Sequence, residues 1–226
     1  MKKSVYIPIK SVIDRVTAGV MLLLLSPVFA GLCIAVAVSS PGPVFFKQKR
    51  VGIYGSYFQI LKFRTMRTDT PSDVPTHQLE DPEKYITKVG AFLRRTSLDE
   101  LPQLINILKG DMAFVGPRPA LWNQYDLVEE REKYGANDIL PGLTGWAQIN
   151  GRDELEIPLK AKYDGFYARH MGPILDIVCL MGTLISVIEQ RGVVEGGTGA
   201  MKKPKKQREI RIDISIGPKK DDEEEI

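Results

Sequence analysis

The most distinctive pattern in the chain is a single uncharged, apolar stretch that covers residues 16–38. A helix of about 20 apolar residues is long enough to cross the hydrocarbon core of a bilayer. Ser26 and Pro27 interrupt the stretch near its middle, and a proline inside a helix removes a backbone donor and clashes with the preceding turn. We therefore expect a membrane helix with a kink at Pro27, where the Ser26 hydroxyl satisfies a carbonyl that the kink frees.

Basic residues flank the apolar stretch on both sides. Lys10 and Arg15 precede it, and Lys47, Lys49 and Arg50 follow it. Because basic flanks favour the cytoplasmic side, a helix that enters one leaflet and returns would satisfy both flanks. A spanning helix would place one flank on the opposite side. The pattern leaves both geometries open, a simple span and a re-entrant hairpin.

Short strands are expected after the apolar stretch. Residues 44–46 and 57–63 have the composition of strands, and a glycine-containing turn at residues 52–56 separates them, so we expect a β-hairpin. Residues 66–84 are polar and contain three prolines, which predicts a loop. The glycine-rich residues 141–152 predict a second loop.

Apolar residues at helical spacing predict the helices. One helix is expected over residues 86–93 and another after Ser97. A third begins at Pro173, which suits the first turn of a helix, and reaches about Gln190 with a broad apolar face. That helix is too short and too polar to cross a membrane. Its apolar face packs either in the protein core, the more common arrangement, or in the membrane interface.

These patterns divide the chain into three parts. Residues 1–40 form the membrane segment, which ends at a turn-rich sequence. Residues 41–200 are long enough for one domain with its own core. Residues 201–226 carry a basic run and then an acidic run, which predicts a tail that is either solvated and disordered or in contact with anionic lipid.

Composition argues against several classes of protein. The net charge is only +3 and the sequence has no basic stripe interleaved with aromatic residues, so nucleic-acid binding is not expected. The two histidines argue against a histidine-built zinc site or a Ser-His-Asp triad. Cys33 and Cys179 lie in apolar stretches, as buried free thiols of a reducing compartment do.

Two adjacent acids, Asp99 and Glu100, stand at the start of an expected helix. Ser97 with Glu100 three residues later is a capping-box pattern, whereas a helix that starts near Pro102 would leave both acids in the turn before it. Either register holds both carboxylates at the positive end of a helix dipole. On this local pattern alone, a capping role is the more common explanation.

Nearby arginines change this interpretation. Arg94 and Arg95 lie just upstream of the acids, and Arg118 lies between two prolines, so its backbone is stiff. A rigid arginine suits bidentate binding of phosphate, and a helix N-terminus also favours phosphate. Carboxylates, arginines and a helix start beside a membrane segment together indicate chemistry on a phosphate ester.

Four motifs then make the pattern specific. They are KFRTM at 62–66, LRRTSLDELPQL at 93–104, GDMAFVGPRP at 110–119 and PGLTGWAQINGR at 141–152. With these motifs in consistent order, the sequence resembles the bacterial sugar transferase family, the monotopic phosphoglycosyl transferases that start glycan assembly on polyprenyl phosphate. The resemblance covers residues from about 10 to 190.

The resemblance implies a fold and a location. The expected fold is α+β and mainly helical, with an N-terminal re-entrant helix broken at Ser26 and Pro27, amphipathic interfacial helices and a small β-hairpin. The chain shows none of the additional N-terminal spans of larger family members, so it resembles the minimal catalytic form. The implied location is the cytoplasmic face of the bacterial inner membrane.

The resemblance also implies a two-step reaction. Asp99 attacks the sugar-linked phosphorus of a UDP-sugar, releases UMP and carries the phosphosugar, which polyprenyl (undecaprenyl) phosphate then takes. Mg²⁺ is the expected cofactor because the diphosphate must be neutralised. Asp99 and Glu100 are the expected catalytic residues and metal ligands.

Further residues would bind the substrates. The expected substrate-binding residues are Arg94, Arg118, Lys62, Arg64, Gln148 and Arg152. The arginines and Lys62 would hold phosphate oxygens, and the glycine-rich run would shape the nucleotide pocket. A tight turn at Asn150 and Gly151 is the competing explanation of that run.

Two other function classes compete with this hypothesis. A membrane glycosyltransferase that moves the sugar alone usually carries an Asp-x-Asp motif in a nucleotide-sugar domain, and Asp213-Ile214-Ser215 is not such a motif. A non-enzymatic adaptor anchored by the apolar stretch would release no UMP from any UDP-sugar. Selectivity among sugars depends on a few pocket contacts, and neither these nor the oligomeric state follow from the motifs.

Overall fold

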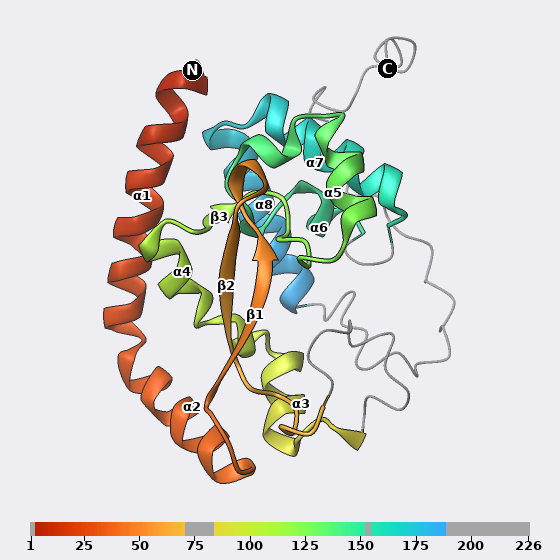
Figure 1. The fold of residues 1–226 in the computed structure, drawn as a ribbon. Helices are drawn as coiled ribbons and strands as arrows, with labels where there is room; N and C mark the ends of the chain where they lie inside the picture. Colours follow the sequence, from red (N-terminus) through yellow and green to blue (C-terminus); the bar gives the residue numbers. More distant parts are fainter. Residues whose placement is uncertain (1–2, 71–83, 152–154, 189–226) are drawn as a thin grey trace.

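The computed structural model describes residues 3–70, 84–151 and 155–188 (Figure 1). The helices are α1 (Lys3–Leu24), α2 (Ser26–Ser39), α3 (Lys88–Arg95), α4 (Gln103–Lys109), α5 (Tyr125–Glu132), α6 (Trp146–Ile149), α7 (Ile157–His170) and α8 (Pro173–Ile188). The strands are β1 (Phe45–Val51), β2 (Tyr57–Phe63), β3 (Ala113–Val115) and β4 (Gly142–Thr144), and short 3-10 helices are η1 (Ile53–Gly55), η4 (Leu98–Glu100) and η5 (Ala136–Asp138). The described chain is mainly helical with little sheet, as predicted.

The apolar stretch forms two helices that meet at a sharp bend. α1 and α2 are inclined by 68° at a break after Leu24. Pro27 lies in the first turn of α2, and the Ser26 hydroxyl donates to the carbonyl of Leu23 at 2.7 Å, so the predicted kink and its compensating hydrogen bond are confirmed. Within the described residues, no single helix has the length and hydropathy of a membrane span, and the bent pair reaches them only when both helices are counted together.

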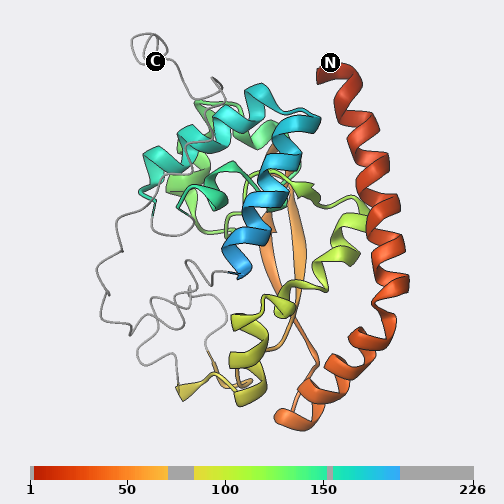
Figure 2. The ribbon, with the colours of Figure 1, turned by 180° about the vertical axis from the view of Figure 1, so that it is seen from behind.

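The polarity of α1 is inverted with respect to a helix of a water-soluble protein. α1 lies along one edge of the molecule beside α4 (Figures 1 and 2). Its buried positions, four residues apart, are Tyr6, Lys10, Asp14 and Ala18. Most of its large exposed residues are apolar, and they include Val5, Val12, Ile13, Val16, Val20 and Leu23, although Lys3 and Arg15 are exposed as well. Such a helix buries two charged groups in the protein and presents a mostly apolar surface outward.

A buried network of charges joins α1 to α8. The Nζ of Lys10 lies 2.7 Å from Asp176 and 3.1 Å from Asp14. The hydroxyls of Tyr6 and Tyr167 each donate to the Asp176 carboxylate at 2.7 Å. Lys10, which the sequence suggested as a flanking charge for membrane topology, is therefore an internal ion-pair partner, and Arg15 lies one residue beyond this network on the same helix.

The predicted β-hairpin is present, with a first strand longer than expected. β1 and β2 pair antiparallel, and η1 closes the turn between them. Phe45 and Phe63 of the hairpin stack at a centroid distance of 5.6 Å, and Phe29 of α2 lies 5.0 Å from Phe63. This aromatic group attaches the hairpin to α2.

The glycine-rich run at 141–152 is not the loop that the sequence predicted. Its first part is β4, which pairs parallel with β3, and α6 follows. The glycines permit a close approach of two backbones, because a Cβ on Gly142 would lie 2.1 Å from the backbone nitrogen of Gly116. The competing turn at Asn150 and Gly151 is also formed, and Asn150 Nδ2 donates to the Trp146 carbonyl at 2.8 Å.

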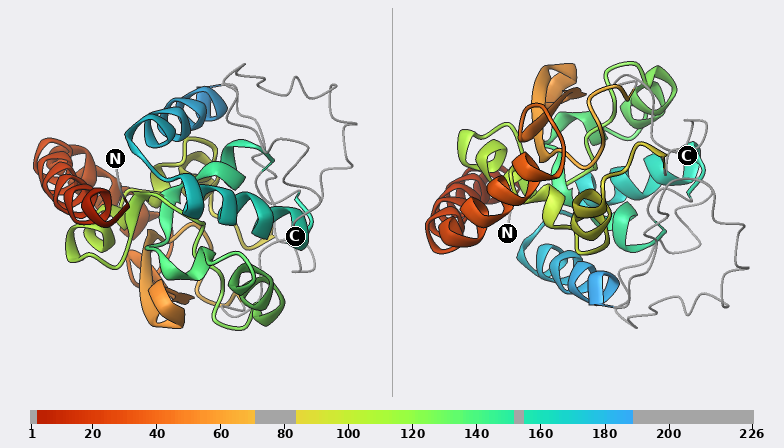
Figure 3. Two further views of the ribbon diagram at one scale, coloured as in Figure 1. Left: turned by 90° about the horizontal axis from the view of Figure 1, so that it is seen from above. Right: turned by 90° about the horizontal axis from the view of Figure 1, so that it is seen from below.

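The helix predicted over residues 86–93 is present as α3, which begins at Lys88, two residues later than expected, and the helix predicted from Pro173 is α8. Viewed along the long axis of the molecule, α8 and the β-hairpin lie on opposite sides of the body, with α1 at one edge (Figure 3). α8 buries Leu175 and Cys179 in the core, as expected for core packing, and leaves Ile174, Ile177 and Leu184 exposed on its other side. The charged tail at 201–226 lies outside the described residues.

The buried network predicts a strong effect of Lys10. Lys10→Ala leaves the buried carboxylates of Asp14 and Asp176 without their cation, and breaking a buried pair in this way costs about 3–5 kcal/mol. We expect a clearly lower thermal unfolding midpoint in detergent than for Lys3→Ala, which removes an exposed charge from the same helix. Equal midpoints for the two variants would contradict this account.

Candidate functional site

Asp99 and Glu100 lie in a short 3-10 helix that precedes α4. Ser97 has a left-handed backbone conformation (φ 57°) and its side chain makes no capping hydrogen bond, so the capping-box prediction is wrong. The alternative register is correct, because α4 begins at Gln103, directly after Pro102. A non-glycine residue at positive φ is uncommon and costs free energy, and here it turns the chain so that both acids face the same cluster of cations.

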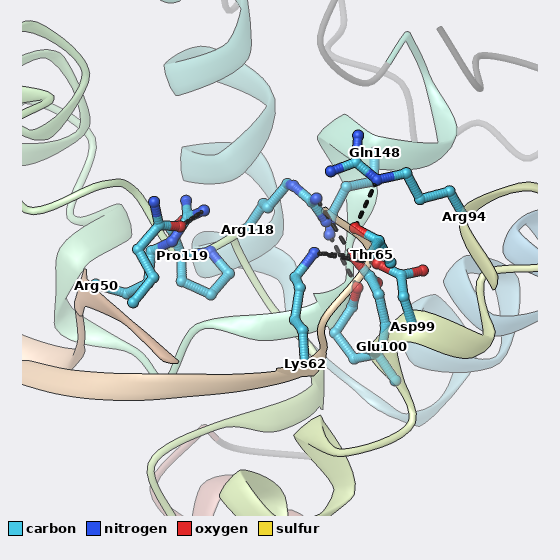
Figure 4. A network of polar contacts seen from close by, with 11 residues as sticks. Arg50, Lys62, Thr65, Arg94, Asp99, Glu100, Arg118, Pro119 and Gln148 are labelled. Atoms are coloured by element: carbon cyan, nitrogen blue, oxygen red, sulfur yellow. Dashed lines mark hydrogen bonds and ion pairs between the residues drawn. The ribbon is translucent and has the colours of Figure 1, made fainter. Parts of the chain in front are cut away.

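Lys62 and Arg118 converge on the acidic pair (Figure 4). The Nζ of Lys62 lies 2.7 Å from Glu100 Oε1 and 3.9 Å from Asp99 Oδ2. The Nη2 of Arg118 lies 3.4 Å from the same Glu100 oxygen. The structure thus brings together four residues that the sequence proposed, from β2, η4 and the turn after β3.

Arg94 approaches the cluster from the last turn of α3. Its Nε donates to Thr65 Oγ1 at 2.8 Å, and its positive charge acts on Asp99. Thr65 follows β2 directly, so this hydrogen bond fixes α3 relative to the strand that carries Lys62. Arg94 is therefore the third cation of the site.

The two carboxyl groups have opposite electrostatic environments. Burial raises the pKa of Asp99 above its usual range and Glu100 raises it further, against the lowering effects of Lys62, Arg94 and Arg118. Burial also acts to raise the pKa of Glu100, but Lys62 and Arg118 outweigh it and lower the pKa to about 2. Glu100 is thus held ionised by its partners, whereas Asp99 is the more basic of the pair. Pairs of carboxyls with divergent pKa values are typical of divided catalytic roles.

Arg64 does not join this cluster. Its buried guanidinium donates to the carbonyls of Ser40 at 2.5 Å and Pro41 at 3.1 Å, directly after α2. It therefore stabilises the turn that follows α2, and the phosphate-binding role expected from the sequence stays a prediction.

Gln148 is a buried residue of α6. Its Nε2 donates to the Leu143 carbonyl at 3.2 Å, and its Oε1 lies 2.6 Å from where a Cβ on Gly145 would stand. Because the same position on Gly145 is 2.1 Å from the Gly116 carbonyl, Gln148 packs behind the turn that carries Arg118. Arg152, the remaining predicted contact, lies outside the described residues.

Sequence reasoning missed Arg50. Its Nη1 donates to the Pro119 carbonyl at 3.0 Å, next to Arg118 (Figure 4). The sequence treated Arg50 only as a charge that flanks the membrane segment. Strand alternation is the signal that could have identified it. Lys62 pairs with Phe46, and Arg50 lies four residues after Phe46 on the same strand, so Arg50 and Lys62 lie on one face of the hairpin.

The acidic pair fits a magnesium ion that arrives with a diphosphate. In residues 3–70, 84–151 and 155–188, no group of three or more His, Cys, Asp or Glu side chains is placed to hold a metal. Mg²⁺ is commonly bound by one or two carboxylates together with substrate phosphates. Asp99 and Glu100 supply two such carboxylates, and one Glu100 oxygen is already engaged by Lys62 and Arg118.

The lowered pKa of Glu100 predicts a contribution to acid stability. Folding lowers this pKa from 4.5 to about 2, so the stabilisation is fully present above pH 4.5 and is lost as the pH falls toward 2. In Glu100→Gln, the unfolding free energy measured by chemical denaturation should fall less steeply below pH 4.5 than in the wild type. Glu129→Gln, at an exposed position of α5, serves as the control. An unchanged slope in Glu100→Gln would refute the assignment.

The chain resembles known proteins over most of its length. The model of the bacterial sugar transferase family matches residues 5–190. The chain is 37% identical over 193 residues to a UDP-glucose:undecaprenyl-phosphate glucose-1-phosphate transferase of Xanthomonas campestris pv. campestris, covering 82% of this chain and 40% of that protein. It is 44% identical over 171 residues to an Escherichia coli (strain K12) protein of the same name, covering 73% of this chain and 37% of that protein.

A third relative is similar in length. The uncharacterized sugar transferase EpsL of Bacillus subtilis (strain 168) is 40% identical over 178 residues, which cover 78% of this chain and 86% of EpsL. The match to the two glucose-1-phosphate transferases is thus confined to less than half of their length, whereas the match to EpsL includes most of both chains. The family match extends from α1 to the end of α8 and includes every residue of the acidic and basic cluster, so the chain belongs to the bacterial sugar transferase family.

Proposed function

We propose that the protein transfers a sugar phosphate from a UDP-sugar to polyprenyl phosphate, through a covalent intermediate on Asp99. The observation that carries the proposal is the pairing of a basic, largely buried Asp99 with a Glu100 that two cations hold ionised. The names of two relatives, which specify UDP-glucose and undecaprenyl phosphate, support the same donor and acceptor classes.

The first step forms the intermediate. An oxygen of the Asp99 carboxylate attacks the sugar-linked phosphorus of the UDP-sugar, and a new O–P bond forms. The bond between that phosphorus and the bridging oxygen breaks, and its electron pair leaves with UMP. Desolvation suits Asp99 to this role, because a carboxylate whose pKa is raised by burial is a better nucleophile than one that water stabilises.

The second step returns the enzyme to its starting state. A phosphate oxygen of polyprenyl phosphate attacks the same phosphorus, the acyl phosphate bond breaks, and its electrons return to the Asp99 carboxylate. The product is a polyprenyl diphosphate sugar. Such a product would be the first membrane-bound intermediate of a glycan such as O-antigen, capsule, exopolysaccharide or a glycoprotein glycan.

The cations stabilise the charge that moves between these oxygens. Lys62 and Arg118 lie within 4 Å of the acidic pair, and Arg94 acts on Asp99 from α3. Fixed cations in a largely buried site stabilise developing negative charge without reorganising during the reaction. Mg²⁺ held by Asp99 and Glu100 would neutralise the diphosphate and stabilise the leaving oxygen.

The apolar surface supports a membrane-bound arrangement. We propose that α1 and α2 enter one leaflet of the bacterial inner membrane and return, because α1 presents apolar residues outward and Ser26 and Pro27 bend the pair. Basic residues on both sides favour a cytoplasmic location for both ends. The catalytic domain would then lie on the leaflet from which the polyprenyl phosphate headgroup emerges.

Asp99→Asn tests the nucleophile. The variant keeps the shape of the side chain and removes its charge, so turnover and covalent labelling should be lost while the thermal unfolding midpoint stays close to that of the wild type. With UDP-sugar alone, the wild type should release one equivalent of UMP and carry the phosphosugar on Asp99, measured by mass spectrometry of the peptide. Asp138→Asn, at an exposed position, should retain activity.

The alternatives give different results in this assay. If Asp99 served only as a cap, its loss would cost about 1 kcal/mol of stability and activity would remain. A transferase that moves the sugar alone would release UDP in place of UMP. A protein that releases neither from a panel of UDP-sugars, with UDP-glucose first, would not be the proposed enzyme.

The membrane arrangement has its own test. Lys3→Cys and Lys47→Cys, each in a background without Cys33 and Cys179, should both resist a membrane-impermeant maleimide in intact spheroplasts and react after permeabilisation. Replacing Ser26 and Pro27 with leucines removes the break and should favour a full span, which would expose position 3. Labelling of position 3 from outside in the unaltered hairpin would rule out the re-entrant arrangement.

A further inference from the structure

We infer that Arg50 is a positioning residue that sets the place of Arg118 in the active site, an inference that rests on the proposed function. Arg50 belongs to β1, and its guanidinium contacts the carbonyl of Pro119, the residue after Arg118 (Figure 4). It thus acts on the backbone that carries Arg118. This hydrogen bond connects the β-hairpin to the turn after β3.

The guanidinium of Arg50 is held in a fixed direction. Its Nη1 donates to the Pro119 carbonyl at 3.0 Å, and its Nη2 donates to Gln48 Oε1 at 2.6 Å. A planar guanidinium with two terminal nitrogens engaged cannot rotate without losing one of these bonds. The hydrogen bond to Gln48 therefore orients the Arg50 guanidinium toward the Pro119 carbonyl.

Backbone contacts join the same two segments. The nitrogen of Val51 donates to the Ala120 carbonyl at 3.0 Å, and Arg50 forms an isolated β-bridge with Leu121. On the other side of Arg118, the nitrogen of Gly142 donates to the Pro117 carbonyl at 2.8 Å. The residues before and after Arg118 are thus both held through their carbonyls.

This arrangement leaves Arg118 little freedom. Both neighbours of Arg118 are prolines, whose φ angles are fixed near −65°. Only the ψ angle of Pro119 separates its carbonyl from the Arg118 backbone, so we expect a shift of this carbonyl to displace Arg118 and the guanidinium that lies 3.4 Å from Glu100. Misplacement of such a group by about 1 Å can reduce a reaction by about 100-fold.

The hairpin also relates the positions of Lys62 and Arg118, two of the three cations of the site. In the antiparallel register, Gln48 pairs with Ile60, Arg50 with Phe58 and Phe46 with Lys62. Directly paired residues point to the same face, so Gln48, Arg50 and Lys62 share one face of the hairpin. Lys62 contacts Glu100 directly, and Arg50 places Arg118 on the same carboxylate from the other side.

A double-mutant cycle tests this inference with UMP as the probe. Arg50→Lys keeps the charge and cannot reproduce both hydrogen bonds, so we expect the Kd for UMP, measured by calorimetry on the full chain in detergent, to rise about tenfold. Arg118→Ala should weaken binding further. In the Arg118→Ala background, Arg50→Lys should have no additional effect, because Arg50 acts through Arg118.

Matched variants separate positioning from a general loss of structure. Gln48→Leu removes only the acceptor that aims Arg50 and should raise the Kd by a smaller factor with an unchanged unfolding midpoint. Lys49→Ala alters the opposite face, where Nζ lies 4.0 Å from the Tyr57 ring centroid, and should leave the Kd as in the wild type. A loss of UMP binding by Lys49→Ala equal to that of Arg50→Lys would overturn the inference.

The remaining outcomes are equally decisive. If Arg50→Lys binds UMP as the wild type does, or has the same effect with and without Arg118, then Arg50 does not position Arg118. If Arg118→Ala binds UMP normally, the inference is overturned although the donor class stands. If the wild type fails to bind UMP and releases none from any UDP-sugar, the proposed function itself fails.

Discussion

The structure depends on the pairing of one buried lysine. Lys10 lies in the interior between two carboxylates, and removing a charge from water is favourable only when partners replace the solvent. Asp176 also accepts hydrogen bonds from two tyrosines, so a single carboxylate joins α1, α7 and α8. The amide of Phe114 donates to Asp14 at 3.4 Å and adds β3 to the same group. α1 is therefore fixed to the rest of the domain by paired charges, while most of its apolar residues remain outside.

Ion pairing also governs the acidic pair of the site, but there it stabilises the charge of only one of the two carboxyl groups. Glu100 is matched by two cations and stays ionised, whereas Asp99 is desolvated with its cations at longer range and keeps its basicity. Two adjacent residues thus acquire different properties from the direction in which the 3-10 helix points them. The positive φ of Ser97 is the local strain that produces this direction.

Local sequence signals predicted the elements that local forces determine. The bend at Pro27, the hairpin, α3, and the end of α4 at Gly110 follow from proline, strand alternation, helical spacing and a left-handed glycine. The predictions that failed concern contacts between residues far apart in the sequence. The glycine-rich run was expected to be a loop because the approach of Gly142 to Gly116 is invisible in either segment alone. Arg64 and Arg50 carry the same charge as Arg118. Only the fold shows that Arg64 binds carbonyls directly after α2, whereas Arg50 supports the site.

The inverted polarity of α1 has a consequence for the order of synthesis. Lys10 has one partner in α1 itself, Asp14, and a second in α8, Asp176, and the hydrogen bond from Tyr6 to Asp176 joins residues 170 positions apart. While the chain is being made, only the pair with Asp14 can form before α8 has left the ribosome. An incomplete chain would therefore hold Lys10 by Asp14 alone. Completion of α8 is the event that closes the buried network and fixes α1 to the rest of the domain.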